Sequence, residues 1–278
     1  MSLDSRRTAA RTTDAITIAY DDQGAGDPVV LIHGHPFDRS MWRPQVEHFT
    51  EAGWRVIVPD LRGYGLSTVV PGITAFDRFA RDIVDLLDRL GLDRVVLGGL
   101  SMGGQIVMEF YRLFPHRVRA LLLADTSAAA ETAAGKTARR AAADRLLREG
   151  MGPYADEVLA TMVTPTNIGA LPAVADQVLA MMRATPPEGA AAALRGRAER
   201  PDYLDLLPVI TAPTLVVVGS DDEFTPVADA LLIVDRVPGA VLAVIDDAGH
   251  LPNLERPSQF NATLGRFLDS LPAESPAR

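Results

Sequence analysis

The chain contains no cysteine among its 278 residues, and only five of those residues are histidines. The lack of cysteine excludes disulfide bonds and thiolate nucleophiles. Basic residues are outnumbered as well, with 27 Lys and Arg against 36 Asp and Glu and a net charge of -9 at pH 7. Nucleic acids and anionic membranes would repel such a chain, so we expect neither as a partner.

Long apolar runs are also missing. The first fifteen residues are polar, and Arg6 and Arg7 are not followed by an apolar stretch of signal-peptide length. We therefore expect no secretory signal and no transmembrane helix, and we expect a cytoplasmic location. The remaining composition, 47% hydrophobic and 23% charged, is typical of a globular protein with a sizeable core.

Short apolar runs alternate with amphipathic helical patterns along most of the chain. Strands are expected at residues 16–20, 29–32, 54–58, 95–97, 118–124, 214–218 and 240–245, and helices at 41–52, 76–90, 102–114, 227–237 and 258–271. This alternation predicts an α/β fold with a mostly parallel sheet and helices on both faces. Residues 126–207 show helical patterns only, which predicts an all-helical cap inserted into a core domain of residues 1–125 and 208–278.

The segment Gly99-Leu100-Ser101-Met102-Gly103 lies between an expected buried strand and an expected helix. In that context Gly-x-Ser-x-Gly is the sequence form of the nucleophile elbow, a sharp turn that exposes a reactive serine. The two glycines remove side chains that would collide with neighbouring backbone. The motif alone also fits a turn without chemistry, so the serine needs partners elsewhere in the chain.

A serine hydroxyl becomes a good nucleophile when a base takes its proton and a third group orients that base. His250 follows the last expected strand, at the edge of the sheet where the elbow also emerges. Asp222, Asp221 and Asp125 are candidates for the third group because all three follow expected strands. We choose Asp222 as the acid, with Asp221 and Asp125 as alternatives. The order Ser101, Asp222, His250 is that of the α/β-hydrolase arrangement.

On these residues the chain resembles the α/β-hydrolase superfamily over nearly its whole length. Within it the chain is most similar to the ester- and lactone-cleaving group typified by 3-oxoadipate enol-lactonases and carboxylesterases. In that group the acid lies three residues after the glycine that ends its strand, which selects Asp222 over Asp221. The matching motifs are His33-Gly34-His35-Pro36 with Trp42, Asp60-Leu61-Arg62-Gly63-Tyr64-Gly65-Leu66-Ser67, Gly99-Leu100-Ser101-Met102-Gly103-Gly104, Gly219-Ser220-Asp221-Asp222 with Pro226, and Gly249-His250 with Asn253-Leu254-Glu255-Arg256-Pro257.

The resemblance further implies an oxyanion hole formed by the backbone N–H groups of His35 and Met102. His33 and His35 make a poor metal site, because two histidines at i and i+2 lack a nearby third ligand. We expect no metal and no other cofactor. Candidate substrate-pocket residues, chosen because they neighbour the expected catalytic positions, are Phe37, Trp42, Phe224 and Leu251.

The expected cap holds four of the eight methionines, Met151, Met162, Met181 and Met182, for which ordinary packing is favoured over a role in the pocket. Helical spacing predicts that most of the cap arginines face solvent. We therefore expect an apolar roof over Ser101. Such a roof favours uncharged esters and lactones and disfavours the enol-lactone of a dicarboxylate.

Together these features predict a serine hydrolase that cleaves carboxylic esters or lactones of small molecules through a Ser-His-Asp triad and an acyl-enzyme. Two other enzymes use the same triad and stay open as alternatives. One is a perhydrolase, also called a cofactor-free haloperoxidase, and the other is a C–C bond hydrolase. A small-molecule receptor that keeps the triad is a further alternative. The oligomeric state stays open.

Overall fold

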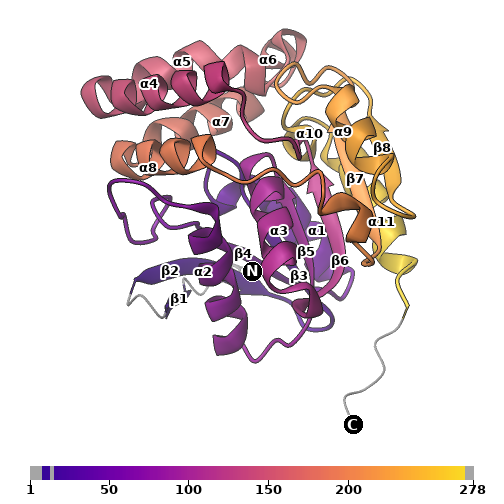
Figure 1. Ribbon diagram of the computed structural model, residues 1–278. Coiled ribbons are helices and arrows are strands. Elements are labelled where there is room, and N and C mark those ends of the chain that lie inside the picture. Colours follow the sequence, from indigo (N-terminus) through magenta and orange to yellow (C-terminus); the bar gives the residue numbers. More distant parts are fainter. Residues whose placement is uncertain (1–7, 13–15, 273–278) are drawn as a thin grey trace.

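A computed structural model describes residues 8–12 and 16–272 (Figure 1). In this part of the chain, eight strands form one sheet in the order β1-β2-β4-β3-β5-β6-β7-β8. The pairs β1–β2 and β2–β4 are antiparallel, and the other neighbouring pairs are parallel, as expected. The strands are β1 (Thr8–Arg11), β2 (Thr17–Gln23), β3 (Pro28–Ile32), β4 (Arg55–Pro59), β5 (Val95–Leu100), β6 (Val118–Ala124), β7 (Thr214–Gly219) and β8 (Val241–Ile245).

Helices cover both faces of the sheet, which confirms the predicted layering. On one face lie α2 (Phe76–Arg89), α3 (Met102–Leu113) and α9 (Val227–Val234), and on the other α1 (Arg43–Glu51) and α11 (Pro257–Asp269). In β5, Val95 and Leu97 join the hydrophobic cluster of the first face, while Val96 and Leu100 join that of the second. This alternation follows from the two-residue period of a strand. Shorter helical segments are Arg39–Trp42, Pro115–Arg117, Leu207–Val209 and α10 (Pro252–Glu255).

The chain between β6 and β7 forms five α-helices, the short segment Leu207–Val209 and no strand, which confirms the all-helical insertion. Figure 1 shows these helices together at one end of the sheet. In the cap, α4 packs against α8 and α5 packs against α7. The four cap methionines lie in hydrophobic clusters. Met151, Met181 and Met182 have the expected packing role alone, whereas Met162 also lines a cavity. The cap helices are α4 (Ala133–Glu149), α5 (Met151–Met162), α6 (Pro165–Ala170), α7 (Pro172–Ala184) and α8 (Pro187–Ala198).

Strand β1 is a feature that the sequence pattern did not predict. Its four residues, Thr-Ala-Ala-Arg, carry little apolar surface, so no strand signal rises from them alone. The strand exists because it pairs with β2 at the edge of the sheet, with Thr8 opposite Tyr20 and Arg11 opposite Thr17. Backbone pairing with β2 therefore stabilises an extended conformation that the local sequence of β1 does not favour by itself.

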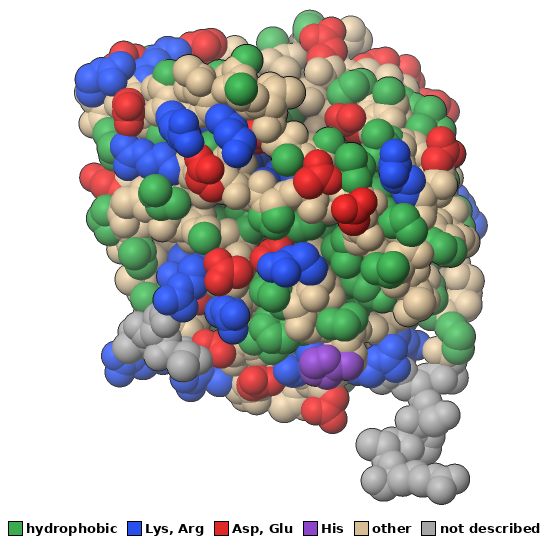
Figure 2. Space-filling model, viewed as in Figure 1, with side chains coloured by type: hydrophobic (Ala, Val, Ile, Leu, Met, Phe, Trp, Pro, Cys, Tyr) green, Lys and Arg blue, Asp and Glu red, His purple; other side chains and the backbone are tan. Residues whose placement is uncertain are grey.

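The face of the molecule in Figure 2 carries acidic and basic side chains interspersed with each other. Hydrophobic side chains are scattered between them over the same face. None of the helices within residues 8–12 and 16–272 has the length and apolar character needed to cross a membrane.

Helix α8 lies directly against the backbone of the core, and two of its glycines make this possible. A Cβ on Gly196 would come 1.7 Å from the carbonyl oxygen of Thr74, and a Cβ on Gly189 would come 1.9 Å from that of Gly63. The Thr74 backbone N–H also donates a hydrogen bond of 3.0 Å to the carbonyl of Ala192. The position of α8 is thus set by contact with the loops that follow β4.

We expect Gly196→Ala to lower the free energy of unfolding by roughly 1–3 kcal/mol, because the added methyl group overlaps the Thr74 carbonyl and forces α8 away from the core. Gly152→Ala in α5 is the matched control. A Cβ there meets no heavy atom within 4 Å, so the same change should raise stability by about 0.5–1 kcal/mol. Urea unfolding of both variants measures the two effects. A free energy of unfolding that is the same in Gly196→Ala as in the wild type would contradict the close contact.

Candidate active site

Ser101 occupies a sharp turn between β5 and α3, with backbone angles φ 84° and ψ -107°. Few residues other than glycine adopt such a positive φ, so the surrounding structure must hold this conformation. A Cβ on Gly99 would lie 2.3 Å from the carbonyl carbon of Gly103, and a Cβ on Gly103 would lie 2.3 Å from the carbonyl oxygen of Ile32. The steric need for both glycines is therefore confirmed.

The predicted histidine lies within hydrogen-bond distance of both the predicted serine and the predicted aspartate. His250 Nε2 is 2.9 Å from Ser101 Oγ, and His250 Nδ1 is 2.8 Å from Asp222 Oδ2. The histidine comes from the loop after β8 and the aspartate from the loop after β7, and all three residues are at most 4% exposed. Parallel strands bring these loops to one edge of the sheet.

Asp222 is held as a carboxylate by several donors. The backbone N–H groups of Phe224 and Thr225 donate to its Oδ1, at 2.8 and 3.0 Å, and the Thr225 hydroxyl donates to its Oδ2 at 2.6 Å. Burial by itself would raise the pKa of Asp222, but His250 and the donors from Thr225 together lower it below its usual value. Sequence analysis missed Thr225. The acceptance of the Phe224 N–H by Asp222 is the usual turn formed by an aspartate side chain, and this turn brings Thr225 to the carboxylate.

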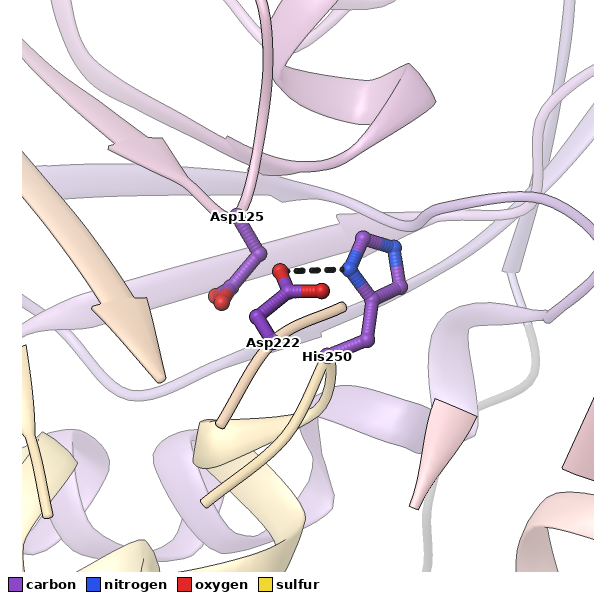
Figure 3. A group of neighbouring side chains, drawn as sticks. All are labelled: Asp125, Asp222 and His250. Atoms are coloured by element: carbon purple, nitrogen blue, oxygen red, sulfur yellow. Dashed lines mark hydrogen bonds and ion pairs between the residues drawn. The ribbon is translucent and has the colours of Figure 1, made fainter. Parts of the chain in front are cut away.

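The two alternative acids occupy different environments. Asp221 is exposed, whereas Asp125 is 1% exposed and lies beside Asp222 (Figure 3). Oδ1 of Asp125 accepts a hydrogen bond of 2.9 Å from the Gly219 N–H, and Oδ2 has no partner within the described residues. Burial, and then the charge of Asp222, raise the pKa of Asp125 well above its usual range. A neutral Asp125 fits this position.

Ligand atoms of Asp125, Asp222 and His250 lie within 4.8 Å of one another, which is close enough for a metal ion. Both oxygens of Asp222 already accept hydrogen bonds, one of them from His250 Nδ1 in the neutral tautomer that leaves Nε2 facing Ser101. A metal here would have to break that link. Asp222 and His250 are better described as a hydrogen-bonded pair, with Asp125 beside them, than as part of a metal centre.

The loop after β3 passes close to the serine. A Cβ on Gly34 would lie 3.4 Å from Ser101 Cβ and 3.0 Å from the Leu100 carbonyl oxygen, so His35 follows at the elbow itself. Met102 is the first residue of α3, and its N–H therefore has no partner inside the helix. The two backbone N–H groups predicted to form an oxyanion hole therefore belong to segments next to Ser101. His35 is in the loop after β3, and Met102 is at the start of α3.

The side chain of His33 is fully used by the fold. Its Nδ1 lies 2.8 Å from the Gly34 carbonyl and its Nε2 accepts the Leu61 N–H at 2.9 Å, while burial lowers its pKa. His35 Nδ1 lies 2.8 Å from the Tyr64 hydroxyl, and its Nε2 has no partner within residues 8–12 and 16–272. The two rings therefore do not act together as metal ligands.

A cavity of about 270 Å³ lies between the cap and the core, and one of its lining residues, Phe224, contacts His250. The centre of the Phe224 ring lies 4.9 Å from that of the His250 ring, in an edge-on arrangement. The other lining residues include His35, Glu131, Arg139, Tyr154, Met162, Leu194 and Arg197.

Phe37, Trp42 and Leu251 do not line this cavity, and neither do Ser101 and His250, so the selection of the first three as pocket residues stays a prediction. Each of the three is completely buried in a hydrophobic cluster that includes residues of the sheet, of helices α1 and α11 and of the cap. The Trp42 ring, for example, lies 6.1 Å from that of Phe260. Neighbours in sequence point in different directions, so adjacency to a catalytic position does not place a side chain in the pocket.

The expectation of an apolar roof is confirmed only in part: Met162 and Leu194 line the cavity, but Arg139 and Arg197 line it as well. Arg200 is also buried, and it donates to the carbonyls of Ala128 and Ala129. The remaining paired arginines of the cap face solvent as expected, and they form ion pairs with acids on the surface: Arg140 with Glu199, Arg145 with Glu149 and Glu157, Arg183 with Asp156, and Arg195 with Asp144.

Comparisons with known proteins identify the fold family and several relatives of this chain. A family model described as alpha/beta hydrolase fold matches residues 27–257. Among curated relatives, 3-oxoadipate enol-lactonase 2 of Acinetobacter baylyi is 30% identical over 263 residues, 92% of this chain and 96% of that protein. A 2-hydroxy-6-oxononadienedioate/2-hydroxy-6-oxononatrienedioate hydrolase of Paraburkholderia phymatum is 32% identical over 273 residues, 91% of each chain. Further relatives carry the names of non-heme haloperoxidases.

Among solved structures, a thermophilic esterase from Thermogutta terrifontis, described as malate bound, superposes with a TM-score of 0.93. It is 40% identical to this chain, and the match covers 96% of this chain and 99% of the esterase.

Asp125→Asn is expected to be more stable than the wild type at pH 7 and to lose less stability between pH 4 and 7. The folded state raises the pKa of Asp125 above 3.8, so folded protein keeps a proton that unfolded protein releases. That contribution therefore falls as the pH rises from about 4. Urea unfolding at several pH values measures the difference. Asp221→Asn, at an exposed position, is the control, and parallel profiles for wild type and Asp125→Asn would contradict the prediction.

Proposed function

The chain belongs to the alpha/beta hydrolase fold family, and we propose that it is a serine hydrolase that cleaves carboxylic esters or lactones. The observation that carries the proposal is the pair of hydrogen bonds, 2.9 and 2.8 Å long, that joins Ser101 Oγ through His250 to Asp222. The names of the similar proteins, an enol-lactonase and an esterase, support the same class of reaction.

In the first half of the reaction, Ser101 Oγ attacks the carbonyl carbon of the substrate while His250 Nε2 takes the hydroxyl proton. The Asp222 carboxylate holds the imidazole in the required tautomer and stabilises the imidazolium. The carbonyl oxygen becomes an oxyanion that accepts hydrogen bonds from the backbone N–H groups of His35 and Met102. Two such donors contribute several kcal/mol to the stabilisation of the transition state.

The tetrahedral intermediate then collapses. Its bond to the leaving oxygen breaks, His250 gives its proton to that oxygen, and an acyl group remains on Ser101. A water molecule attacks the acyl carbon while His250 takes a proton from it. Ser101 Oγ recovers a proton from His250, and the carboxylic acid leaves. With a lactone, the alcohol and acid products are one hydroxy acid.

The C–C bond hydrolase is the second candidate, because the Paraburkholderia phymatum relative has such a name at 32% identity. A perhydrolase is the third, because relatives are named as haloperoxidases. Turnover rates of the purified protein distinguish the first two reactions, when they are measured on p-nitrophenyl esters, γ- and δ-lactones and a vinylogous 1,5-diketone. Added peroxide and acetate detect peracid formation, and binding without turnover would identify a receptor.

The core of residues 1–125 and 208–278 would supply the triad and the oxyanion donors. The cap of residues 126–207 would cover the bound substrate, since its helices contribute Tyr154, Met162 and Leu194 to the cavity wall. In this arrangement the core supplies the chemistry and the cap selects the substrate.

Ser101→Ala should abolish hydrolysis of p-nitrophenyl acetate and labelling by a fluorophosphonate probe, because the variant lacks the attacking oxygen. The fold should persist, since the new side chain is smaller at the same backbone position. Intact-protein mass spectrometry measures the labelling, and circular dichroism confirms folding. Stoichiometric labelling of the alanine variant would remove Ser101 from its proposed role.

Asp222→Asn should lower kcat on the order of 10⁴-fold, because an amide favours the tautomer that places a proton on the wrong side of His250. Asp221→Asn, one residue earlier and exposed, is the matched control and should retain activity. Asp125→Asn should lower kcat far less than Asp222→Asn. Steady-state kinetics on one aryl ester ranks the variants, and a larger loss at Asp125 would transfer the role of the acid.

A further inference from the structure

Arg197 is a buried cation without a counter-ion. It is 3% exposed, and within residues 8–12 and 16–272 it forms no ion pair and no hydrogen bond from Nε. Its guanidinium carbon instead lies 5.5 Å from the centre of the Phe224 ring. An unpaired buried charge is unfavourable for folding, and natural proteins retain one mainly where it has a task.

Arg197 lines the cavity together with Phe224, the residue that contacts the proposed catalytic His250. Phe224 is in contact with both groups, since its ring lies 4.9 Å from the His250 ring and 5.5 Å from the Arg197 guanidinium carbon. The distance from the Arg197 guanidinium carbon to the centre of the His250 ring is therefore at most the sum of these two distances. The unpartnered Nε2 of His35 borders the same cavity.

The charges around the cavity leave one positive charge in excess. Arg139 and Glu131 both line the cavity and neutralise each other, with 2.5 Å between a guanidinium nitrogen and Oε1. Burial, and then the charges of Arg139 and Arg200, lower the pKa of Arg197 to about 9, while Glu131 and Tyr154 act in the opposite direction. Arg197 is thus still a cation at neutral pH, with no anion to balance it.

The fold holds this cation in place before any ligand binds. Arg197 follows Gly196, whose backbone lies directly on the Thr74 carbonyl, so α8 cannot rotate to carry the side chain into solvent. Preorganised charge is what an anion-binding site requires, because little of the binding energy is then spent on ordering the site.

We propose that Arg197 binds a carboxylate on the substrate, a few bonds from the carbonyl that Ser101 attacks. Building on the proposed hydrolase function, this makes the substrate an ester or lactone that carries a carboxylate on its acyl part. A guanidinium can donate two parallel hydrogen bonds to a carboxylate, which a neutral ester cannot accept in the same way. The cap thereby selects for charge as well as for size.

The kinetic test uses two substrates of equal length, the p-nitrophenyl monoester of glutaric acid and the p-nitrophenyl ester of its neutral terminal amide. Wild type should prefer the anionic ester in kcat/KM. Arg197→Met should lower the ratio of the two kcat/KM values by about 10- to 100-fold, mainly through KM, as the loss of charged hydrogen bonds predicts. Arg197→Lys should retain part of the preference.

Arg195→Met is the matched control, because Arg195 lies on the same helix and forms an exposed ion pair with Asp144. It should leave the ratio of the two kcat/KM values unchanged. Equal losses for both substrates in Arg197→Met, or no preference in wild type, would overturn the carboxylate site. Failure of wild type to hydrolyse either ester would instead count against the proposed hydrolase function.

A second measurement does not depend on turnover. In the Ser101→Ala background, glutarate should raise the Tm and glutaramide should not, and Arg197→Met should remove the difference. Without ligand, Arg197→Met should itself raise the Tm, because it removes an unpaired buried charge. A purely structural arginine would give a lower Tm, and that result, or equal shifts by both compounds, would overturn the proposal.

Discussion

The close approach of three backbone segments at Ser101 is the constraint on which the rest of the site depends. The end of β5, the first turn of α3 and the loop after β3 meet there so tightly that no Cβ fits at Gly99 or Gly103. The positive φ of Ser101 is held by this packing. The same contacts bring the backbone at Gly34 close to Ser101. The nucleophile and the proposed oxyanion donors, the N–H groups of His35 and Met102, would therefore share one structural cause.

Two aspartates beside His250 show how environment divides the roles of identical side chains. Asp222 accepts hydrogen bonds on both oxygens, and its pKa falls. Asp125 is buried with one oxygen unpartnered and a neighbouring negative charge, and its pKa rises. Only the first is suited to orient a histidine and to balance the positive charge that develops on it during the proposed reaction. The second borders the same network without a direct link to His250 (Figure 3).

The cap adds a different kind of constraint. Gly189 and Gly196 let helix α8 pack directly against the backbone of the loop between β4 and α2. This packing places Arg197 in the cavity wall rather than in solvent. An uncompensated cation there lowers stability, whereas a carboxylate in the cavity would restore the balance of charge. A core that supplies common chemistry and a cap that supplies selectivity would explain why relatives of similar fold have the names of lactonases, esterases and C–C hydrolases.

Local patterns in the sequence were sufficient for the strand and helix order, the helical insertion and the turn at Ser101, because periodicity and glycine placement act over a few residues. Chain order and family motifs then selected Asp222 and His250, which the structure brings into hydrogen-bond distance. Strand β1 and the directions of Phe37, Trp42 and Leu251 were decided by the tertiary structure, through pairing and packing across the sheet. The inward position of Arg197 was also decided there, because helical spacing describes one face of a helix but not the surface against which that face is packed.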